Sequence, residues 1–294
     1  MGLFIDGARG VPYNNLISPV VLATNCKDPD WVVLDCRFDL SDPESGLRQW
    51  KRSHIPGAVY ADLERDLSSP ATETSGRHPL PDPVDLAECF SQWGIGIDTQ
   101  VVAYDDSDGA IAARAWWLLR WLGHEQVSVL DGGFNAWRRA GLPLVDDVTE
   151  PEPAHFELKL HNDMLVDADE LAQSLNQDYV VLDARAAPRF LGEVEPLDKQ
   201  AGHIPGAHNY PYTANLDRNG AFLPPEELRV YFDAARQYAP PEHVICMCGS
   251  GVTACHNLLA MHIAGLHGAR LYCGSWSEWS RDANRDVETG PDLY

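Results

Sequence analysis

Short apolar runs recur along the chain, and each is soon followed by an aspartate. These runs occupy residues 32–34, 101–103 and 180–182. They are apolar on both faces, which is typical of strands buried in a parallel sheet. Residues 112–122 carry Trp116, Trp117 and Trp121 at helical spacing, which predicts a helix with a buried face. Alternating strands and helices predict an α/β fold, with helices on both faces of a parallel sheet.

The same sequence elements occur twice in the same order. The repeated pairs are WVVLDCR at 31–37 with YVVLDAR at 179–185, HIPGA at 54–58 with 203–207, and residues 101–137 with 243–279. The last pair keeps a constant displacement of 142 residues, and the first copy has a surplus of about seven residues between 58 and 101. We therefore predict two tandem domains, residues 1–147 and 158–294. An acidic, proline-rich stretch at 141–157 suits a solvated linker.

Charge and cysteine content narrow the class of protein. A net charge of −22 argues against a nucleic-acid surface and against binding to an acidic membrane. No apolar run reaches the roughly 18 residues that a bilayer span needs. Seven cysteines, an odd number, are typical of reduced and mostly buried thiols. We expect a cytoplasmic protein.

The two copies differ in the turn that follows residues 101–104 and 243–247. Ligands of parallel sheets bind at such turns, where strands end and helices begin. At the displacement of 142 residues, Asp106 corresponds to Cys248 and Asp108 corresponds to Ser250. One copy thus offers carboxylates and no thiol, whereas the other offers a thiol and no carboxylate. This exchange predicts that the second copy is the working site.

The second turn suits a reactive cysteine. Gly249 and Gly251 allow successive backbone N–H groups to point inward as an anion-binding nest. A helix that begins near Val252 adds its positive end. Both features favour the thiolate form of Cys248, which we predict to be the nucleophile.

Two other kinds of site that contain cysteines are alternatives to this interpretation. A zinc site would draw on Cys246, Cys248, Cys255, His256 and Cys273, but their spacing matches no paired Cys-x-x-Cys motif. A cysteine phosphatase needs an arginine six residues after its cysteine to bind phosphate, and that position holds Ala254. The cysteine spacing thus predicts that no metal is bound, and Ala254 argues against a phosphatase.

The CGSGVT loop at 248–253, with the repeated VLDxR and HIPGA elements, resembles the tandem-domain rhodanese family of sulfurtransferases over nearly the whole chain. The resemblance implies two rhodanese-like domains, the N-terminal one non-catalytic and the C-terminal one catalytic. It also implies a persulfide cycle on Cys248 that needs no metal or organic cofactor. Gly249, Gly251, Val252 and Thr253 would then form the substrate-binding loop.

Within that family, the loop also predicts the sulfur donor. Thiosulfate enzymes carry basic residues after the cysteine, whereas Gly249 and Ser250 are neutral, as in 3-mercaptopyruvate sulfurtransferases. Mercaptopyruvate leaves as the enolate of pyruvate, which needs a proton source such as Ser250. Thiosulfate remains the alternative donor. The acceptor would be a thiol, thioredoxin among the candidates, or cyanide. A third reading is a sulfur-relay or regulatory binding module with little turnover.

The resemblance further implies residues that bind the substrate carboxylate. Arg185 and Arg189 follow the repeated strand and would face the cysteine loop. Because Arg37 occupies the position of Arg185 in the non-catalytic copy, a structural role for Arg185 stays open.

A proton relay and an aromatic contact complete the expected site. His78, with Glu64 or Asp62 as its acid, would join Ser250 in the relay. Trp276 would line the site, although its counterpart Phe134 leaves a packing role open. His54 and His203 occur in both copies, so we interpret them as structural.

Overall fold

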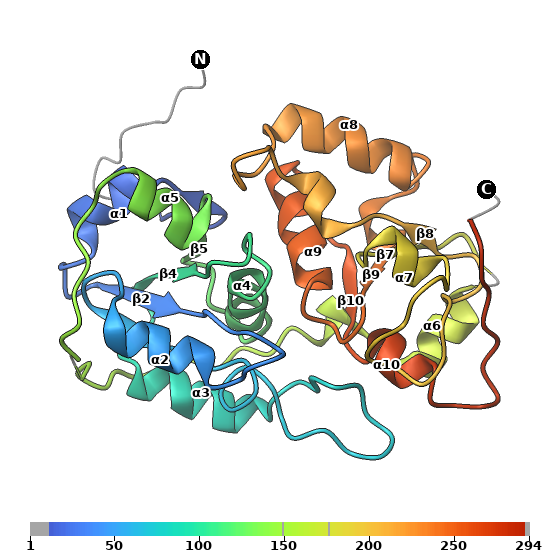
Figure 1. Ribbon diagram of the computed structural model, residues 1–294, viewed down its shortest axis with the longest axis horizontal. Helices are drawn as coiled ribbons and strands as arrows, with labels where there is room; N and C mark the ends of the chain where they lie inside the picture. Colours follow the sequence, from blue (N-terminus) through green and yellow to red (C-terminus); the bar gives the residue numbers. More distant parts are fainter. Residues whose placement is uncertain (1–11, 149, 176, 292–294) are drawn as a thin grey trace.

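The computed structural model describes residues 12–148, 150–175 and 177–291, which form two α/β units side by side (Figure 1). Each unit holds one five-stranded sheet in which every strand pairing is parallel. The strand orders are β1-β5-β4-β2-β3 and β6-β10-β9-β7-β8, which are the same order in the two copies. The internal repeat is therefore a repeat of topology, and the predicted α/β class is confirmed.

The elements of the two copies correspond one to one through the sheets. The first copy contains β1 (Leu16–Ile17), α1 (Pro19–Asn25), β2 (Trp31–Asp35), α2 (Ser45–Arg52), β3 (Ala58–Tyr60), α3 (Pro83–Gln92), β4 (Gln100–Tyr104), α4 (Ala112–Trp121), β5 (Val127–Leu130) and α5 (Gly133–Arg139). The second contains η1 (Asn162–Met164), β6 (Leu165–Val166), α6 (Ala168–Ser174), β7 (Val180–Asp183), α7 (Ala187–Phe190), β8 (His208–Asn209), η2 (Tyr212–Asn215), α8 (Pro225–Ala235), η3 (Pro241–His243), β9 (Val244–Met247), α9 (Ala254–Ile263), β10 (Arg270–Tyr272) and α10 (Ser275–Trp279). The three apolar runs are β2, β4 and β7, and the Trp-rich stretch is α4.

Helices cover both faces of each sheet because the strands are apolar on both faces. Val33 and Val102 pack with Trp137 of α5 on one face of the first sheet. Their neighbours Val32 and Val101 belong to a different cluster on the other face, together with residues of α3 and α4. Successive strand residues point to opposite faces, so a doubly buried strand must be apolar throughout.

The two copies share one core. Helices α4 and α9 lie side by side between the sheets (Figure 1), and a single buried cluster runs through both of them. It includes Trp117 and Leu118 of α4 and Leu259 and Met261 of α9. Full burial of each such side chain contributes about 1.5–3 kcal/mol, so this helix pair ties the copies into one packed body.

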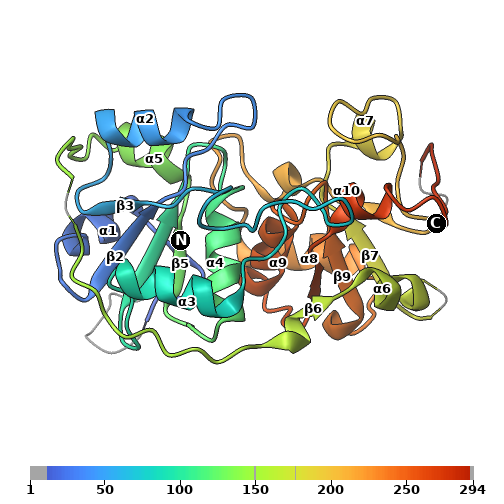
Figure 2. The same cartoon turned by 90° about the horizontal axis from the view of Figure 1, so that it is seen from below.

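Each copy also sends a segment across to the other. Residues 61–82, which include the surplus of the first copy, run from β3 to the neighbourhood of α10 (Figure 2). In the opposite direction, the segment between β8 and α8 brings the backbone N–H of Phe222 within 2.9 Å of an Asp131 carboxylate oxygen. These crossings place residues of one copy against the loop of the other.

The stretch at 141–157 is only partly the solvated linker that its composition suggests. Most of its described side chains are exposed, but Phe156 is buried against Phe90 of α3. The backbone N–H of Ala154 also donates to the carbonyl of Ser91. Its end is therefore part of the first copy's packing. Within the described ranges, none of the helices combines the length and apolar character needed to cross a lipid bilayer.

Candidate active site

Cys248 lies directly after β9, in the loop 248–253 that leads into α9 at the carboxyl edge of the second sheet. Only 2% of the residue is exposed. Its backbone N–H donates to Ser275 Oγ at 3.0 Å, and its carbonyl accepts from the N–H of Trp276 at 3.0 Å. Gly251 has φ +78°, and a Cβ there would lie 2.4 Å from the carbonyl oxygen of Cys273. The α10 turn thus fixes the loop, and glycine is required at 251.

The backbone N–H groups of the two equivalent loops differ in their hydrogen-bond acceptors. In the first copy the buried Asp105 carboxylate accepts from the N–H groups of Ser107, Gly109, Ile111 and Ala112, at 2.8–2.9 Å. In the second copy, none of the N–H groups of residues 249–253 donates a hydrogen bond to another described residue. The first loop therefore carries its own anion. The N–H groups that follow Cys248 have no such acceptor among the described residues, which suits a loop that binds an anionic sulfur.

Two neighbouring thiols are poorly suited to compete with Cys248 as nucleophiles. Cys246 is inside β9 and Cys255 is in α9, and neither is exposed. Burial raises the pKa of Cys255 to about 12, because its effect is larger than the opposing effect of the Arg114 charge. Burial also raises the pKa of Cys246. Both stay protonated near neutral pH, whereas the thiolate is the reactive form of cysteine.

The first copy supplies a histidine to the catalytic loop. His78, on the segment 61–82, places Nδ1 2.7 Å from Ser250 Oγ. Burial, followed by the charges of Arg114 and Arg77, lowers the pKa of His78 to about 4. The imidazole is therefore neutral at physiological pH. Among the described residues, Ser250 is the only hydrogen-bond partner that the ring has.

The acids suggested for the relay do not reach that histidine. Glu64 is exposed, and its backbone N–H donates to Asp62 Oδ1 at 2.9 Å. The Asp62 carboxylate also accepts from the N–H of Arg65 and from the Tyr60 hydroxyl. It caps a turn of its own segment. The structure brings Ser250 and His78 together but brings neither acid to them.

Arg185 is held in the same way as its counterpart in the first copy. Its Nε and Nη2 atoms donate to the buried carboxylate of Asp183 at 2.6–3.1 Å, and Nη2 also donates to the carbonyl of Gly202. The guanidinium stacks over Trp276 at 4.7 Å. Arg37 repeats this arrangement with Asp35, Ser53 and the ring of Phe134. Arg185 and the fully buried Trp276 ring thus repeat the packing of the first copy. Unlike Arg37, Arg185 also lies close to the acidic partner of Arg189, because its Nη1 is 3.6 Å from Glu195 Oε2.

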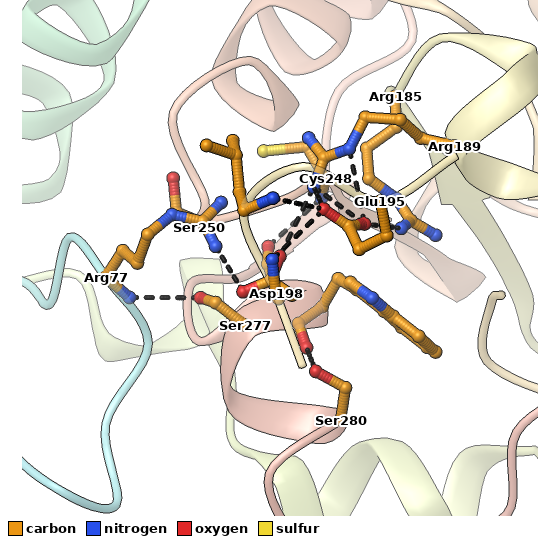
Figure 3. A network of polar contacts seen from close by, with 12 residues as sticks. Arg77, Arg185, Arg189, Glu195, Asp198, Cys248, Ser250, Ser277 and Ser280 are labelled. Atoms are coloured by element: carbon orange, nitrogen blue, oxygen red, sulfur yellow. Dashed lines mark hydrogen bonds and ion pairs between the residues drawn. The ribbon is translucent and has the colours of Figure 1, made fainter. Parts of the chain in front are cut away.

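Arg189 is placed differently, because it lies above the loop. A Cβ on Gly249 would be 3.2 Å from Arg189 Nη1 and 3.0 Å from Nη2 of Arg77. Arg189 pairs with Glu195 at 2.8 Å and with Asp198 at 3.2 Å, and Arg77 pairs with the other oxygen of Asp198 (Figure 3). The two arginines and their acidic partners therefore form an ion-pair cluster beside Gly249, the residue that follows Cys248.

The remaining loop residues shape the base of the site. Val252 is buried in the shared core, and Thr253 is the half-buried residue that precedes α9. His54 and His203, repeated in both copies, each place Nδ1 against a backbone carbonyl, that of Trp50 and Phe190 respectively. This pairing matches the structural role expected of them.

A buried arginine from the first copy braces both the loop and the histidine. Arg114 of α4 is fully buried, and it donates to the carbonyls of Gly251 and His78, both at 3.3 Å. Its counterpart in α9 is His256, whose Nε2 lies 3.1 Å from the carbonyl of Asp108 in the first copy's loop. Equivalent positions of the two central helices therefore each contact the loop of the other copy.

Sequence reasoning missed Arg77, Arg114, Glu195 and Asp198. Arg77 adjoins His78 in the surplus segment, so a signal was present in the sequence. Arg114 sits within a Trp-rich helix and looks like an ordinary surface arginine, because a sequence does not show which helix faces the neighbouring copy.

Known proteins resemble this chain over most of its length. The chain is 51% identical over 278 residues to the "Probable 3-mercaptopyruvate sulfurtransferase" of Pseudomonas aeruginosa, covering 94% of this chain and 98% of that protein. It is 35% identical over 286 residues to the thiosulfate sulfurtransferase of Rattus norvegicus, covering 93% and 94%. The solved 3-mercaptopyruvate sulfurtransferase from Leishmania major superposes with a TM-score of 0.80 at 33% identity, covering 91% of this chain and 74% of that one.

A family match covers both copies. The family model of the rhodanese-like domain matches residues 18–140 and again residues 167–282. The two matches account for most of the chain and for both sheets. The chain therefore belongs to the rhodanese-like family, with one such domain in each half.

Proposed function

We propose that this protein is a sulfurtransferase that moves sulfur from 3-mercaptopyruvate to an acceptor thiol or cyanide through a persulfide on Cys248. The observation that carries the proposal is the contrast between the two loops: the Asp105 carboxylate accepts from four N–H groups of the first, whereas those of residues 249–253 donate to no described residue. The sulfurtransferase names of the relatives support the same reaction class.

The first half-reaction breaks a carbon–sulfur bond. The Cys248 thiolate attacks the sulfur of mercaptopyruvate, a sulfur–sulfur bond forms, and the electron pair of the broken bond leaves as the enolate of pyruvate. Carbon 3 of the enolate then takes up a proton, which balances the proton lost from the donor's thiol. The loop N–H groups stabilise the anionic persulfide that remains.

Ser250 and His78 manage the proton in this step. Because the His78 ring is neutral, it serves Ser250 as a hydrogen-bond partner and not as a fixed cation. Proton delivery from the Ser250 hydroxyl requires the tautomer in which His78 Nδ1 carries hydrogen and donates to Ser250 Oγ. The ring then restores the hydroxyl proton from Nδ1 while Nε2 takes up the proton that the donor's thiol has released, so the ring stays neutral. Such acid catalysis contributes roughly 10²–10⁴-fold to rate.

The second half-reaction regenerates the thiolate. An acceptor thiolate attacks the outer sulfur of the persulfide, takes it as its own persulfide, and releases Cys248 as the leaving group. Cyanide takes the same sulfur as thiocyanate. Thioredoxin is the protein acceptor that we propose, because it presents a nucleophilic thiolate.

Thiosulfate is the second candidate donor, and one observation favours it. Although Gly249 and Ser250 are neutral, the fold brings Arg77 and Arg189 within 3.0–3.2 Å of a Cβ position on Gly249. Such cations would stabilise departing sulfite. Mercaptopyruvate stays the first candidate because its enolate leaving group needs a proton donor, and Ser250 with His78 supplies one at the loop.

The proposal also covers the roles of the two domains and the cellular compartment of the protein. We place the catalytic domain at residues 158–294 and the non-catalytic domain at 1–147, whose His78 completes the site. All seven cysteines are free thiols in the structure, which suits the reducing cytoplasm.

The test is a donor competition on the purified protein. Pyruvate released from 3-mercaptopyruvate is compared with sulfite released from thiosulfate, with cyanide as acceptor and Cys248→Ser as the blank. We expect pyruvate release to be faster and both products to disappear in the variant. Faster sulfite release would reverse the donor order, and activity that survives in the variant would refute the persulfide on Cys248.

A further inference from the structure

The Asp198 carboxylate lies close to the loop 248–253, because it pairs with the two arginines next to Gly249. Figure 3 shows it between Arg77 and Arg189. One of its oxygens pairs with Arg77 Nη1 and the other lies 3.2 Å from Arg189 Nη2. Its side chain is only 4% exposed. Two arginines that share one carboxylate, an oxygen each, form a ready receptor for that group.

The receptor lies next to the reacting cysteine and is built from both copies. Arg77 belongs to the segment 61–82 of the first copy, and its backbone N–H donates to Ser277 Oγ at 3.0 Å. Arg189 belongs to α7 of the second copy. Both guanidinium groups converge on Gly249, the residue after Cys248, which has no side chain to keep them away.

The charges around this receptor balance when no substrate is bound. The cations are Arg77, Arg185 and Arg189, and the anions are Asp183, Glu195 and Asp198. Arg185 is committed to the buried Asp183, and Glu195 takes one face of Arg189. A carboxylate that enters beside Asp198 would bring excess negative charge into a nearly buried cluster, so it must displace Asp198.

The family resemblance already implies that Arg189 binds the substrate carboxylate. We propose that Arg77 of the first copy completes this receptor, and that Asp198 is an internal carboxylate which holds it closed until the substrate displaces it. Asp198 lies on the loop 191–201, away from any helix or strand, so it can leave without breaking an element. This inference rests on the proposed function, since it names the residues that hold the donor's carboxylate.

Binding of pyruvate, the carboxylate product, to the Cys248→Ser protein tests the receptor without turnover. Isothermal titration gives the Kd in that background for Arg77→Gln, Arg189→Gln and Asp198→Asn. We expect either arginine change to weaken pyruvate about tenfold to a hundredfold, the loss of one charge-assisted contact. Asp198→Asn should tighten binding about tenfold. The same changes with Cys248 intact should shift KM for 3-mercaptopyruvate more than kcat.

Matched controls separate local effects from general ones. Asp233→Asn removes one negative charge from an ion pair with Arg229 on α8. Arg281→Gln removes contacts to Thr72 and Ser75 that brace the segment carrying Arg77. Both controls should leave the Kd for pyruvate within about twofold, since neither residue touches the receptor.

Each outcome decides the inference. Weaker or unchanged pyruvate binding in Asp198→Asn would overturn the displacement and make Asp198 a support for the arginines. Unchanged binding in Arg77→Gln would remove Arg77 from the receptor. Because the titration involves no sulfur transfer, it remains decisive even if the donor competition favours thiosulfate.

Discussion

At the scale of single residues, the internal repeat separates chemistry from packing. Arg185 and Arg37 share their contacts with an aspartate, a carbonyl and an aromatic ring, so we expect those shared contacts to serve the fold. Ser250 has no such counterpart, because Asp108 stands at its position, and it is Ser250 that meets His78. A residue's role is therefore best judged by what its counterpart in the other copy does.

The equivalent arginines Arg185 and Arg37 yield a prediction on stability. Arg185→Met and Arg37→Met each leave a buried aspartate without its partner, so each should lower the free energy of unfolding by about 3–5 kcal/mol. Urea unfolding measures this loss. At temperatures where both variants are folded, Arg37→Met should retain the wild-type KM. A raised KM in Arg185→Met, without loss of stability, would show that Arg185 binds substrate instead.

The relay yields a prediction on rate and pH. His78→Gln keeps a hydrogen-bonding group near Ser250 but cannot pass a proton, so kcat with 3-mercaptopyruvate should fall roughly 10²–10⁴-fold. Because the pKa of His78 is lowered to about 4, protonation of this ring should contribute no change in wild-type kcat between about pH 5 and pH 8. A kinetic pKa near 6.5 that is lost in His78→Gln would contradict a neutral ring.

At the scale of elements, the strand-to-helix loop is the unit that distinguishes the two domains. Both loops follow the central strand of a sheet and precede a central helix, α4 or α9. Arg114 and His256, at equivalent positions in those helices, hold the loop of the opposite copy. The first copy is thus part of the support of the loop that carries Cys248.

The loop of the first copy yields a prediction about Asp105. Asp105→Asn retains one acceptor oxygen for four N–H donors, so some buried donors lose their partner. We expect about 2–4 kcal/mol loss in the free energy of unfolding, with kcat reduced less than twofold. Chemical denaturation and steady-state kinetics on the same preparation check both parts. A large loss of kcat in a stable variant would give the first loop a catalytic role.

At the scale of the whole molecule, the shared core makes the two domains depend on each other. The cluster that includes α4 and α9 is continuous, and the site draws His78 and Arg77 from one half and Cys248 from the other. Several buried histidines lie along this contact and respond together to acid.

Acid should destabilise the protein through those histidines. Burial lowers the pKa of His78 to about 4 and those of His256 and His262 to about 3, against an ordinary 6.5. Between pH 6.5 and those values the unfolded chain binds more protons than the folded one, so stability falls as pH falls. Unfolding free energies at about pH 7.5 and about pH 5 measure this loss. His256→Gln should make the loss smaller, and an equal or larger loss would contradict the prediction.

The sequence determined more of the fold than of the site. Doubly apolar runs, their alternation with helical stretches, and the displacement of 142 residues predicted the α/β class and the duplication, because strand burial and helix amphipathicity are local patterns. The exchange of Asp106 for Cys248 at equivalent turns also predicted the reactive residue. This prediction needed only the alignment of the two copies, which the sequence contains. The family resemblance added His78 and Arg189.

Only the tertiary structure decided which residues meet across the two copies. Asp105 fills the first loop, Arg114 and Arg77 reach the second, Trp276 lies beneath Arg185, and neither Glu64 nor Asp62 approaches His78. Such contacts join positions far apart in sequence, as do Arg77 and Ser277, which are 200 residues apart. They depend on how two finished sheets pack against each other through α4 and α9, and no local pattern of polar and apolar residues records that packing.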